Sequence, residues 1–267
     1  MALFKTLKPL LSSAAIALFV ILAMTNMAYS QSDATSFTYD FHGSKPTSLT
    51  YQGDAFFPSG TTFLRLTKTD TSGIPQPGSI GRVLHSNPIL FRRQGGVASF
   101  ETTINFIISS SPGHNSPADG LVFFVGPVGS TIPAGSAGGN LGMYNQSGLA
   151  PNVFAVEFDV WVNTWDPSFR HIGINLGSRT SSNVTSFEGT NGQPVSARIN
   201  YEAATKVITV HATAAAGTFE VSLAYDLSTL LPEHVQVGLS ASSGLQLVDA
   251  AIHDVVSWYF SSTIVNH

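Results

Sequence analysis

The stretch SFETTINFII, residues 99–108, decides the fold class. Its alternate residues form two faces, a mainly apolar one of Phe100, Thr102, Ile104, Phe106 and Ile108 and a polar one of Glu101, Thr103 and Asn105. A period of two residues is that of a β-strand, and one apolar face beside one polar face is typical of an antiparallel strand that covers a core. The stretch therefore predicts a half-buried antiparallel strand.

Similar stretches recur along the chain and indicate an all-β protein. Further strands are expected to begin near Leu121, Val207, Thr218, Val235 and Val255, separated by clusters of Gly, Pro, Ser and Asn. Many short strands predict a sandwich or a barrel. No linker, charge run or repeat divides residues 31–267, so we expect one domain. The longest turn-rich stretches, 109–119 and 126–153, are of a length that often carries function.

The first thirty residues have the pattern of a secretory signal peptide. Lys5 and Lys8 precede an apolar run, which is followed by small residues up to Ser30. No second apolar stretch of about 20 residues follows, so no membrane span is expected after cleavage. We expect a mature chain of residues 31–267 that enters the secretory pathway, with an extracellular or a vacuolar destination.

Composition narrows the class of partner. Removing Lys5 and Lys8 from the twelve basic residues leaves ten against sixteen acidic ones, a formal charge of −6 for the mature chain, which argues against nucleic acid. The chain has no Cys, so disulfides are excluded. Two sequons, at Asn145 and Asn183, fit secretion and are candidate glycosylation sites.

A second alternating stretch, FAVEFDVWVN at 154–163, combines a strand pattern with acidic residues. Its even positions are all apolar, whereas its odd positions hold Ala155, Glu157, Asp159, Trp161 and Asn163. Alternate side chains on one face of a strand are roughly 7 Å apart. We therefore expect one strand to carry Glu157, Asp159 and Asn163 in a row outside the core.

This row of side chains favours metal binding. Neighbouring carboxylates repel each other unless one is protonated or a metal keeps both ionised. Asp166 and His171 follow soon after the stretch. Oxygen ligands from Asp159, Asn163, Asp166 and a backbone carbonyl suit Ca²⁺. Glu157 and His171, sharing Asp159 and Asp166, suit Mn²⁺ or another transition metal.

Two other interpretations of these acids remain open at this point. Asp159 and Asp166 are also compatible with ordinary turn-capping acids. Alternatively, Glu157 and Asp159 form the acid and nucleophile of a glycoside hydrolase. Some β-sandwich glycosidases carry an E-x-D-x-E stretch on one strand, but here Trp161 occupies the third acid position.

The stretch VEFDVWVNTWDPSFRHIGIN, residues 156–175, resembles the metal-binding segment of the legume lectin family of plants. The resemblance extends to SFTYDF near residue 36, SPADGLVFFVGPVGS at 116–130, GGNLGMYN at 138–145, and the segments VGLSASSGLQ and HDVVSWYFSS near the C-terminus. These blocks span nearly all of residues 36–262. The resemblance implies a jelly-roll β-sandwich of the concanavalin A-like lectin fold, with a flat back sheet and a curved front sheet.

The resemblance also implies one Mn²⁺ and one Ca²⁺. The matching positions for Mn²⁺ are Glu157, Asp159, Asp166 and His171, and those for Ca²⁺ are Asp159, Asn163, Asp166 and the Trp161 carbonyl. All six positions match the family pattern. Relatives that have lost sugar binding typically show changes in this set, and none is visible here.

The implied function is carbohydrate binding without catalysis. By resemblance the sugar-binding residues are Asp119, which follows a cis peptide at Ala118, together with Gly139, Trp161, Asn163, Leu245 and Gln246. Eight residues separate Gly244 from His253, a loop length that resembles the class binding galactose or N-acetylgalactosamine. Glycans are the expected partners, bound by a homodimer or homotetramer. The alternatives are a glycoside hydrolase, and a storage or defence protein with incidental sugar binding.

Overall fold

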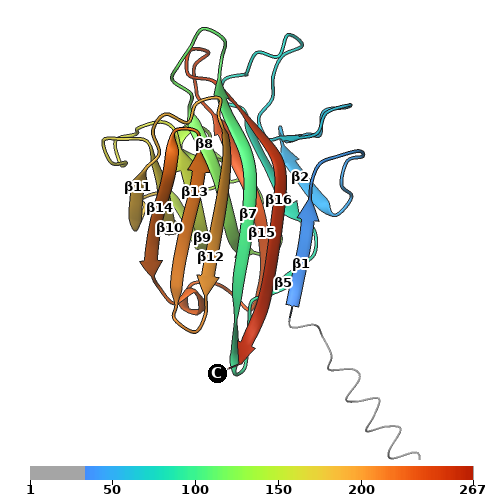
Figure 1. Cartoon of the computed structure of the whole chain (residues 1–267), viewed down its shortest axis with the longest axis vertical. Coiled ribbons are helices and arrows are strands. Elements are labelled where there is room, and N and C mark those ends of the chain that lie inside the picture. The colour runs from blue at the N-terminus through green and yellow to red at the C-terminus, as the bar shows by residue number, and fades with distance from the viewer. Residues whose placement is uncertain (1–33, 267) are drawn as a thin grey trace, which may run out of the picture. The chain divides into compact units, whose positions relative to one another are not determined.

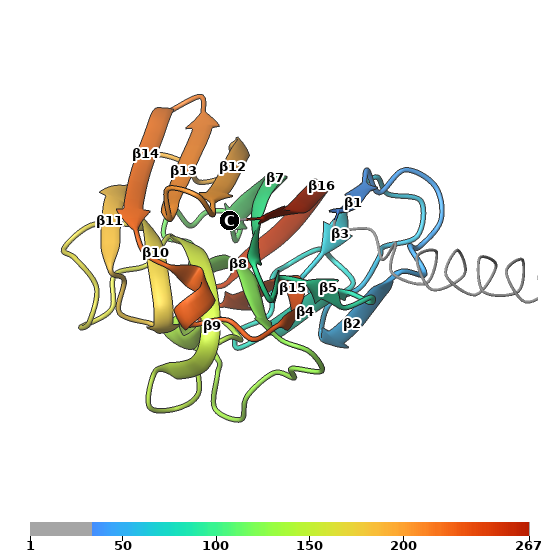
Figure 2. The ribbon, with the colours of Figure 1, turned by 90° about the horizontal axis from the view of Figure 1, so that it is seen from below.

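Two antiparallel β-sheets make up the computed structural model over residues 34–266, the part of the chain that the structure describes (Figures 1 and 2). The predicted all-β jelly-roll sandwich is confirmed. The expected signal peptide of residues 1–30 lies outside the described residues. Within residues 34–266, no helix is long and apolar enough to cross a membrane.

The back sheet contains the longest strands. Its main path runs in the order β1 (Ala34–Tyr39), β16 (Ala251–Asn266), β7 (Gly96–Ser110), β12 (Pro194–Glu202), β13 (Val207–Ala214) and β14 (Gly217–Ala224), with β3 (Leu64–Arg65) beside β16 and β6 (Arg92–Arg93) beside β7. The opening stretch SFETTINFII lies in β7, where the predicted alternation of buried and more exposed residues is observed. Its two neighbours in the sheet, β16 and β12, come from the C-terminus and the middle of the chain.

The front sheet carries the candidate site. Its order is β11 (Asn183–Ser186), β10 (His171–Ser178), β9 (Leu149–Asp159), β8 (Asp119–Pro127), β15 (His234–Ser243), β4 (Ile80–His85) and β2 (Leu49–Gly53), with β5 (Ile89–Leu90) beside β15. Two short 3-10 helices, η1 (Gly138–Asn140) and η2 (Leu227–Thr229), lie in connections. Viewed from below, the two sheets are seen as separate layers (Figure 2).

The main hydrophobic core fills the space between the sheets. The apolar face of β7 meets inward-facing aromatic side chains of the front sheet. The ring centroids of Phe106 and Phe158 are 4.9 Å apart, and those of Phe100 and Phe123 are 6.4 Å apart. Such aromatic pairs contribute about 0.5 to 1.5 kcal/mol beyond the area that they bury.

A second hydrophobic cluster lies on the other face of the front sheet, below the connection between β8 and β9. Leu141, Met143 and Tyr144 from this connection are buried with sheet residues that include Val122 and Ala155. Residues 141–144 of the predicted turn-rich stretch 126–153 are therefore packed against the sheet, and its last residues belong to β9.

Strand register places the acidic residues of β9 beside one end of the sheet. Asp159, the last residue of β9, pairs with His171 of β10 on one side and with Gly120 of β8 on the other. Glu157 pairs with Gly173 and Val122. The ladder therefore brings Glu157, Asp159 and His171 together, although Glu157 and His171 are fourteen positions apart in the chain.

Candidate functional site

Loops at this end of the front sheet enclose a depression of about 300 Å³. Segments far apart in the sequence line it, namely residues 118–119, 137–140, 161–165 and 244–249. All six predicted sugar-binding residues are among its lining: Asp119, Gly139, Trp161, Asn163, Leu245 and Gln246. The structure thus brings these residues together around one concave surface.

Asp119 lies at the floor of the depression and is 4% exposed. The peptide between Ala118 and Asp119 is cis, as the resemblance predicts. Two backbone hydrogen bonds connect Ala118 to residues 244–249, the last contact loop of the depression. Gly244 N donates to Ala118 O, and Ala118 N donates to Asp249 O, both at 2.8 Å. The loop that contains Leu245 and Gln246 is therefore anchored next to Asp119.

The predicted transition-metal residues are adjacent and mostly buried. Asp159, Asp166 and His171 each offer a ligand atom within 4.8 Å of the others. Glu157 joins them through its Oε1, which is 3.1 Å from Nε2 of His171. Asp159 and His171 are each 1% exposed. Burial of acidic groups at this density requires hydrogen bonds, protonation or a cation.

The prediction that one strand carries Glu157, Asp159 and Asn163 is wrong, because the strand does not continue to Asn163. β9 ends at Asp159, and Val162, which the alternation placed on the buried face, is 43% exposed. The reason is a set of local side-chain hydrogen bonds. Asp159 Oδ1 accepts from Trp161 N at 2.8 Å, and Asp166 Oδ2 accepts from Asn163 N at 2.7 Å. Such bonds compete with the strand ladder and turn the chain, so a loop presents Asn163.

Burial and mutual repulsion raise the pKa values of the carboxyl groups around the depression. The pKa of Asp119 is raised to about 8, first by burial and then by the negative charges of Asp249 and Asp166. Burial, followed by the charge of Glu157, holds the pKa of Asp159 well above its ordinary value. Burial also raises the pKa of Asp166. A divalent cation among these groups would favour their ionised forms.

The donor set fits divalent cations. Asn163 Oδ1 is buried without a hydrogen-bond partner among the described residues, and it belongs to the same loop as Asp166. Carboxylate, amide and carbonyl oxygens are the ligands that Ca²⁺ prefers, whereas an imidazole beside carboxylates suits a transition metal. The residues present therefore match both kinds of ion expected from the sequence.

Glu157 has partners that sequence analysis did not identify. Its Oε1 accepts hydrogen bonds from Ser181 Oγ at 2.5 Å and from Asn175 Nδ2 at 3.2 Å. Gly173 permits this packing, because a Cβ there would lie 2.1 Å from Ser181 Oγ and 2.8 Å from Glu157 Oε1. These bonds orient the carboxylate toward His171.

Gly139 lies in close contact with the loop that follows β9. A Cβ at this position would lie 2.3 Å from Asn163 Oδ1 and 2.9 Å from Trp165 Cζ2. Real Cβ atoms do not approach other atoms so closely, because interiors are close-packed. A side chain at position 139 would therefore force the loop that carries Asn163 and Trp165 to move.

Three further residues with polar or aromatic side chains line the depression and were missed from the sequence: Asn140, Trp165 and Asp249. Asp249 Oδ1 accepts a hydrogen bond from Gln246 N at 2.9 Å and thereby shapes the last contact loop. Trp165 directly precedes Asp166 in the chain. A lone aromatic residue in a loop gives no signal of its orientation, so only the folded structure assigns it to the site.

The two sequons differ in their surroundings. Asn183 is exposed on β11, and its Nδ2 donates to Ser222 O at 2.8 Å. Asn145 is partly buried, and its Oδ1 accepts from Ser147 N and Leu149 N in a local turn. Glycosylation of either residue stays a prediction.

Comparison with known proteins supports the same interpretation as the geometry. Residues 34–267 match the legume lectin domain. Agglutinin-2 of Cladrastis kentukea is 40% identical over 273 residues, which cover 98% of this chain and 92% of that protein. A mannose/glucose-specific lectin of Centrolobium tomentosum is 37% identical, covering 88% of this chain and 98% of that one.

A solved structure agrees with the fold over nearly the same range. Winged bean acidic lectin, in complex with methyl-α-D-galactose, superimposes with a TM-score of 0.80 at 36% sequence identity. The match covers 87% of this chain and 100% of the winged bean chain. The chain therefore belongs to the legume lectin family and is a carbohydrate-binding protein, not an enzyme.

Proposed function

We propose that this lectin binds a galactose-class sugar in the depression around Asp119, with one Ca²⁺ and one Mn²⁺ organising the site. Two buried oxygen atoms in the depression carry the proposal. Asp119 Oδ2 and Asn163 Oδ1 have no hydrogen-bond partner among residues 34–266, and they lie beside a cluster of carboxyl groups. A buried acceptor without a donor costs about 1 to 3 kcal/mol, so sugar hydroxyls and a cation are the partners that would satisfy these atoms.

Each ion has a proposed set of residues. Glu157, Asp159, Asp166 and His171 would hold Mn²⁺, and Asp159, Asn163, Asp166 and the Trp161 carbonyl would hold Ca²⁺. The bound ions supply positive charge that keeps the shared carboxylates ionised. The bonds from Ser181 and Asn175 fix Glu157, and the bond from Trp161 N fixes Asp159.

The sugar contacts follow from the chemistry of the lining. Asp119 accepts hydrogen bonds from two hydroxyls, and the Nδ2 of Asn163 donates one while its Oδ1 faces the cation. The backbone N–H of Gly139 donates another, because no side chain blocks its approach. Trp161 offers its indole to the apolar face of the pyranose ring. Leu245 and Gln246 supply backbone contacts from the last loop.

The preference for galactose or N-acetylgalactosamine rests on two observations. The length of the segment between Gly244 and His253 resembles that of legume lectins that bind galactose or N-acetylgalactosamine. The winged bean lectin of similar fold was solved with methyl-α-D-galactose. The relative from Centrolobium is described as mannose/glucose-specific, so family membership alone does not fix the sugar.

A glycan array on protein loaded with Ca²⁺ and Mn²⁺ tests this proposal. Galactosides should bind, EDTA should abolish binding, and the two ions should restore it with the glycan uncut. Asp159→Asn is the matched variant, because it removes one shared carboxylate at nearly constant shape. Selective binding of mannosides would reject the galactose preference, and EDTA-resistant binding would reject the metal proposal.

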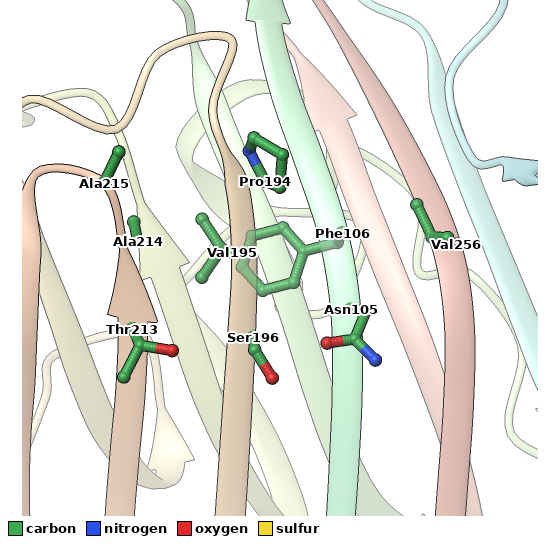
Figure 3. A pocket seen from close by; sticks show the side chains of 9 residues that line it. All are labelled: Asn105, Phe106, Pro194, Val195, Ser196, Thr213, Ala214, Ala215 and Val256. Carbon is green, nitrogen blue, oxygen red and sulfur yellow. The ribbon is translucent and has the colours of Figure 1, made fainter.

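We infer that a second copy of the chain covers the outer face of the back sheet. Short side chains point outward there from adjacent strands, with Ser196 of β12 between Asn105 of β7 and Thr213 of β13 (Figure 3). Val256, 36% exposed on β16, lines the same shallow groove of about 440 Å³. A flat face of short side chains permits the close approach that a homodimer or homotetramer needs. Sedimentation that detects only monomer at micromolar concentration would contradict this inference.

We also propose that residues 1–30 direct the chain into the secretory pathway and are then removed, with N-glycans at Asn145 and Asn183. The final destination is extracellular or vacuolar. Mass spectrometry of the native protein should find an N-terminus at Gln31 and a glycan mass on peptides that contain either sequon.

A further inference from the structure

Arg179 contacts two of the loops that line the depression. It directly follows β10, and its guanidinium carbon lies 3.5 Å from the ring centroid of Trp165. Its Nη1 donates a hydrogen bond to Asn140 Oδ1 at 2.8 Å. Trp165 and Asn140 both line the depression. Arg179 therefore reaches the site through these two residues.

The chain is shaped to let the Arg179 side chain pass. Gly148 has a φ of +77°, and a Cβ there would lie 2.5 Å from Arg179 Nε and 2.8 Å from its Cδ. The backbone nitrogen of Arg179 also donates to Gly148 O at 2.9 Å. A residue with a side chain at position 148 would thus be strained by its φ and would displace the arginine.

The contacts continue from Arg179 to the residues proposed to bind sugar. Trp165 lies in contact with Arg179 and also with Gly139, where a Cβ would come within 2.9 Å of Trp165 Cζ2. Asn140 uses both ends of its amide, accepting from Arg179 and donating from Nδ2 to Gly135 O at 3.2 Å. The segment 135–140 and the loop of Asn163 and Trp165 are therefore connected by one side chain.

We propose that Arg179 is a positioning residue for the sugar site, which clamps the loop carrying Gly139 to the loop carrying Asn163. This inference rests on the proposed sugar site, and it assigns a role to a residue outside that site. The clamp needs a planar cation that stacks on an indole while one of its N–H groups donates sideways. Arginine meets both requirements, whereas the compact ammonium group of lysine does not.

The test uses Arg179→Met and Arg179→Lys in the full mature chain, with Arg92→Met as the matched control. Arg92 is exposed on β6, where its Nε donates to Leu231 O at 3.2 Å, and its removal changes the net charge by the same amount. The dissociation constant for methyl-α-galactoside is measured by calorimetry with saturating Ca²⁺ and Mn²⁺. Bound metal is measured by elemental analysis, and hydrogen exchange is followed over residues 135–148.

Arg179→Met should weaken sugar binding by about three- to tenfold, because only part of the stacking and hydrogen-bond free energy lost between the loops reaches the sugar contacts. Bound metal should stay at the wild-type level, and exchange of residues 135–148 should become faster. Arg179→Lys should restore only part of the affinity. Arg92→Met should leave the dissociation constant and the exchange rates unchanged.

Unchanged hydrogen exchange in Arg179→Met would overturn the clamp, and so would a dissociation constant equal to that of the wild type. Full rescue by lysine would also overturn it, because charge alone would then be sufficient. If the metal-loaded wild type binds no sugar, the proposed function fails. Hydrogen exchange still decides in that case whether Arg179 holds the two loops together, and Arg179→Lys provides this readout if Arg179→Met does not fold.

Discussion

Between the two sheets, apolar side chains meet at every second position, whereas at the loop end of the front sheet the buried groups are polar and their positions are set by turns. Phe100, on the inner face of β7, has four aromatic neighbours within 6.4 Å. Asp119, at the loop end, is as well buried but has an oxygen atom without a partner among the described residues. The first region is expected to determine stability, and the second to determine what is bound.

The largest effect on stability is expected for Phe100→Ala. The substitution removes a ring that is 4% exposed and leaves a cavity, so the free energy of unfolding should fall by about 3 to 5 kcal/mol. Urea denaturation of the metal-loaded protein measures this change. Below the unfolding transition the dissociation constant for sugar should be unchanged. A large change in affinity would show that the two regions are not independent.

Acid should weaken the same interior through His253. Burial lowers the pKa of this fully buried imidazole from 6.5 to about 3. The unfolded chain therefore takes up a proton before the native protein does, so stability falls as pH drops from 6.5 toward 3 and is unaffected above 6.5. At pH 4.5, His253 should lower the free energy of unfolding by roughly 3 kcal/mol relative to neutral pH.

Urea denaturation of metal-free wild type and His253→Gln at pH 7.5 and pH 4.5 measures this loss. The variant keeps a polar side chain but has no imidazole, so its stability should change less between the two pH values. An equal change in both proteins would refute the role of His253.

A smaller effect, on affinity and not on stability, is expected for Asp119→Asn. The change keeps the shape of the side chain and removes the charge of an acceptor at the floor of the depression. Charge-assisted hydrogen bonds are worth about 1.5 to 3 kcal/mol, so sugar binding should weaken roughly thirtyfold. Calorimetry measures the affinity, and the unfolding temperature serves as the control. Wild-type affinity in this variant would place the sugar elsewhere.

The smallest effect is expected for Gly139→Ala. The new methyl group would lie 2.3 Å from Asn163 Oδ1, so the loops must separate by a small distance. Affinity should fall about tenfold, which corresponds to about 1.4 kcal/mol. Gly60→Ala is the control, since a Cβ there meets nothing within 4 Å, although its φ of +74° costs some stability. Equal affinities of the two variants would argue against close approach of sugar at Gly139.

The interior could be predicted from the sequence because a period of two residues is a local property. The alternation in 99–108 is reproduced in β7, and strands form near each predicted start. The same rule failed at Trp161, because apolar residues continue to alternate there while the side chains of Asp159 and Asp166 bond to the backbone and end the strand. Alternation cannot report a competing local hydrogen bond.

The arrangement of residues at the loop end of the front sheet could be predicted only in part from the sequence. Family resemblance placed Asp119, Gly139 and Asn163 around one depression, and the geometry agrees. It did not indicate Trp165 or Arg179, because their contact depends on how two loops approach each other after folding. Similarly, Ser181 contacts Glu157 across twenty-four residues of chain, and neither residue's neighbours in sequence suggest the pairing.

The hydrophobic cluster under the β8–β9 connection has a consequence for the kinetics of binding. Leu141, Met143 and Tyr144 are anchored in this cluster, so the loop that carries Gly139 is ordered before any ligand arrives. Little conformational entropy is then lost on association, and a rigid site favours fast capture without a slow rearrangement step. Affinity differences among sugars should therefore appear mainly in their dissociation rates.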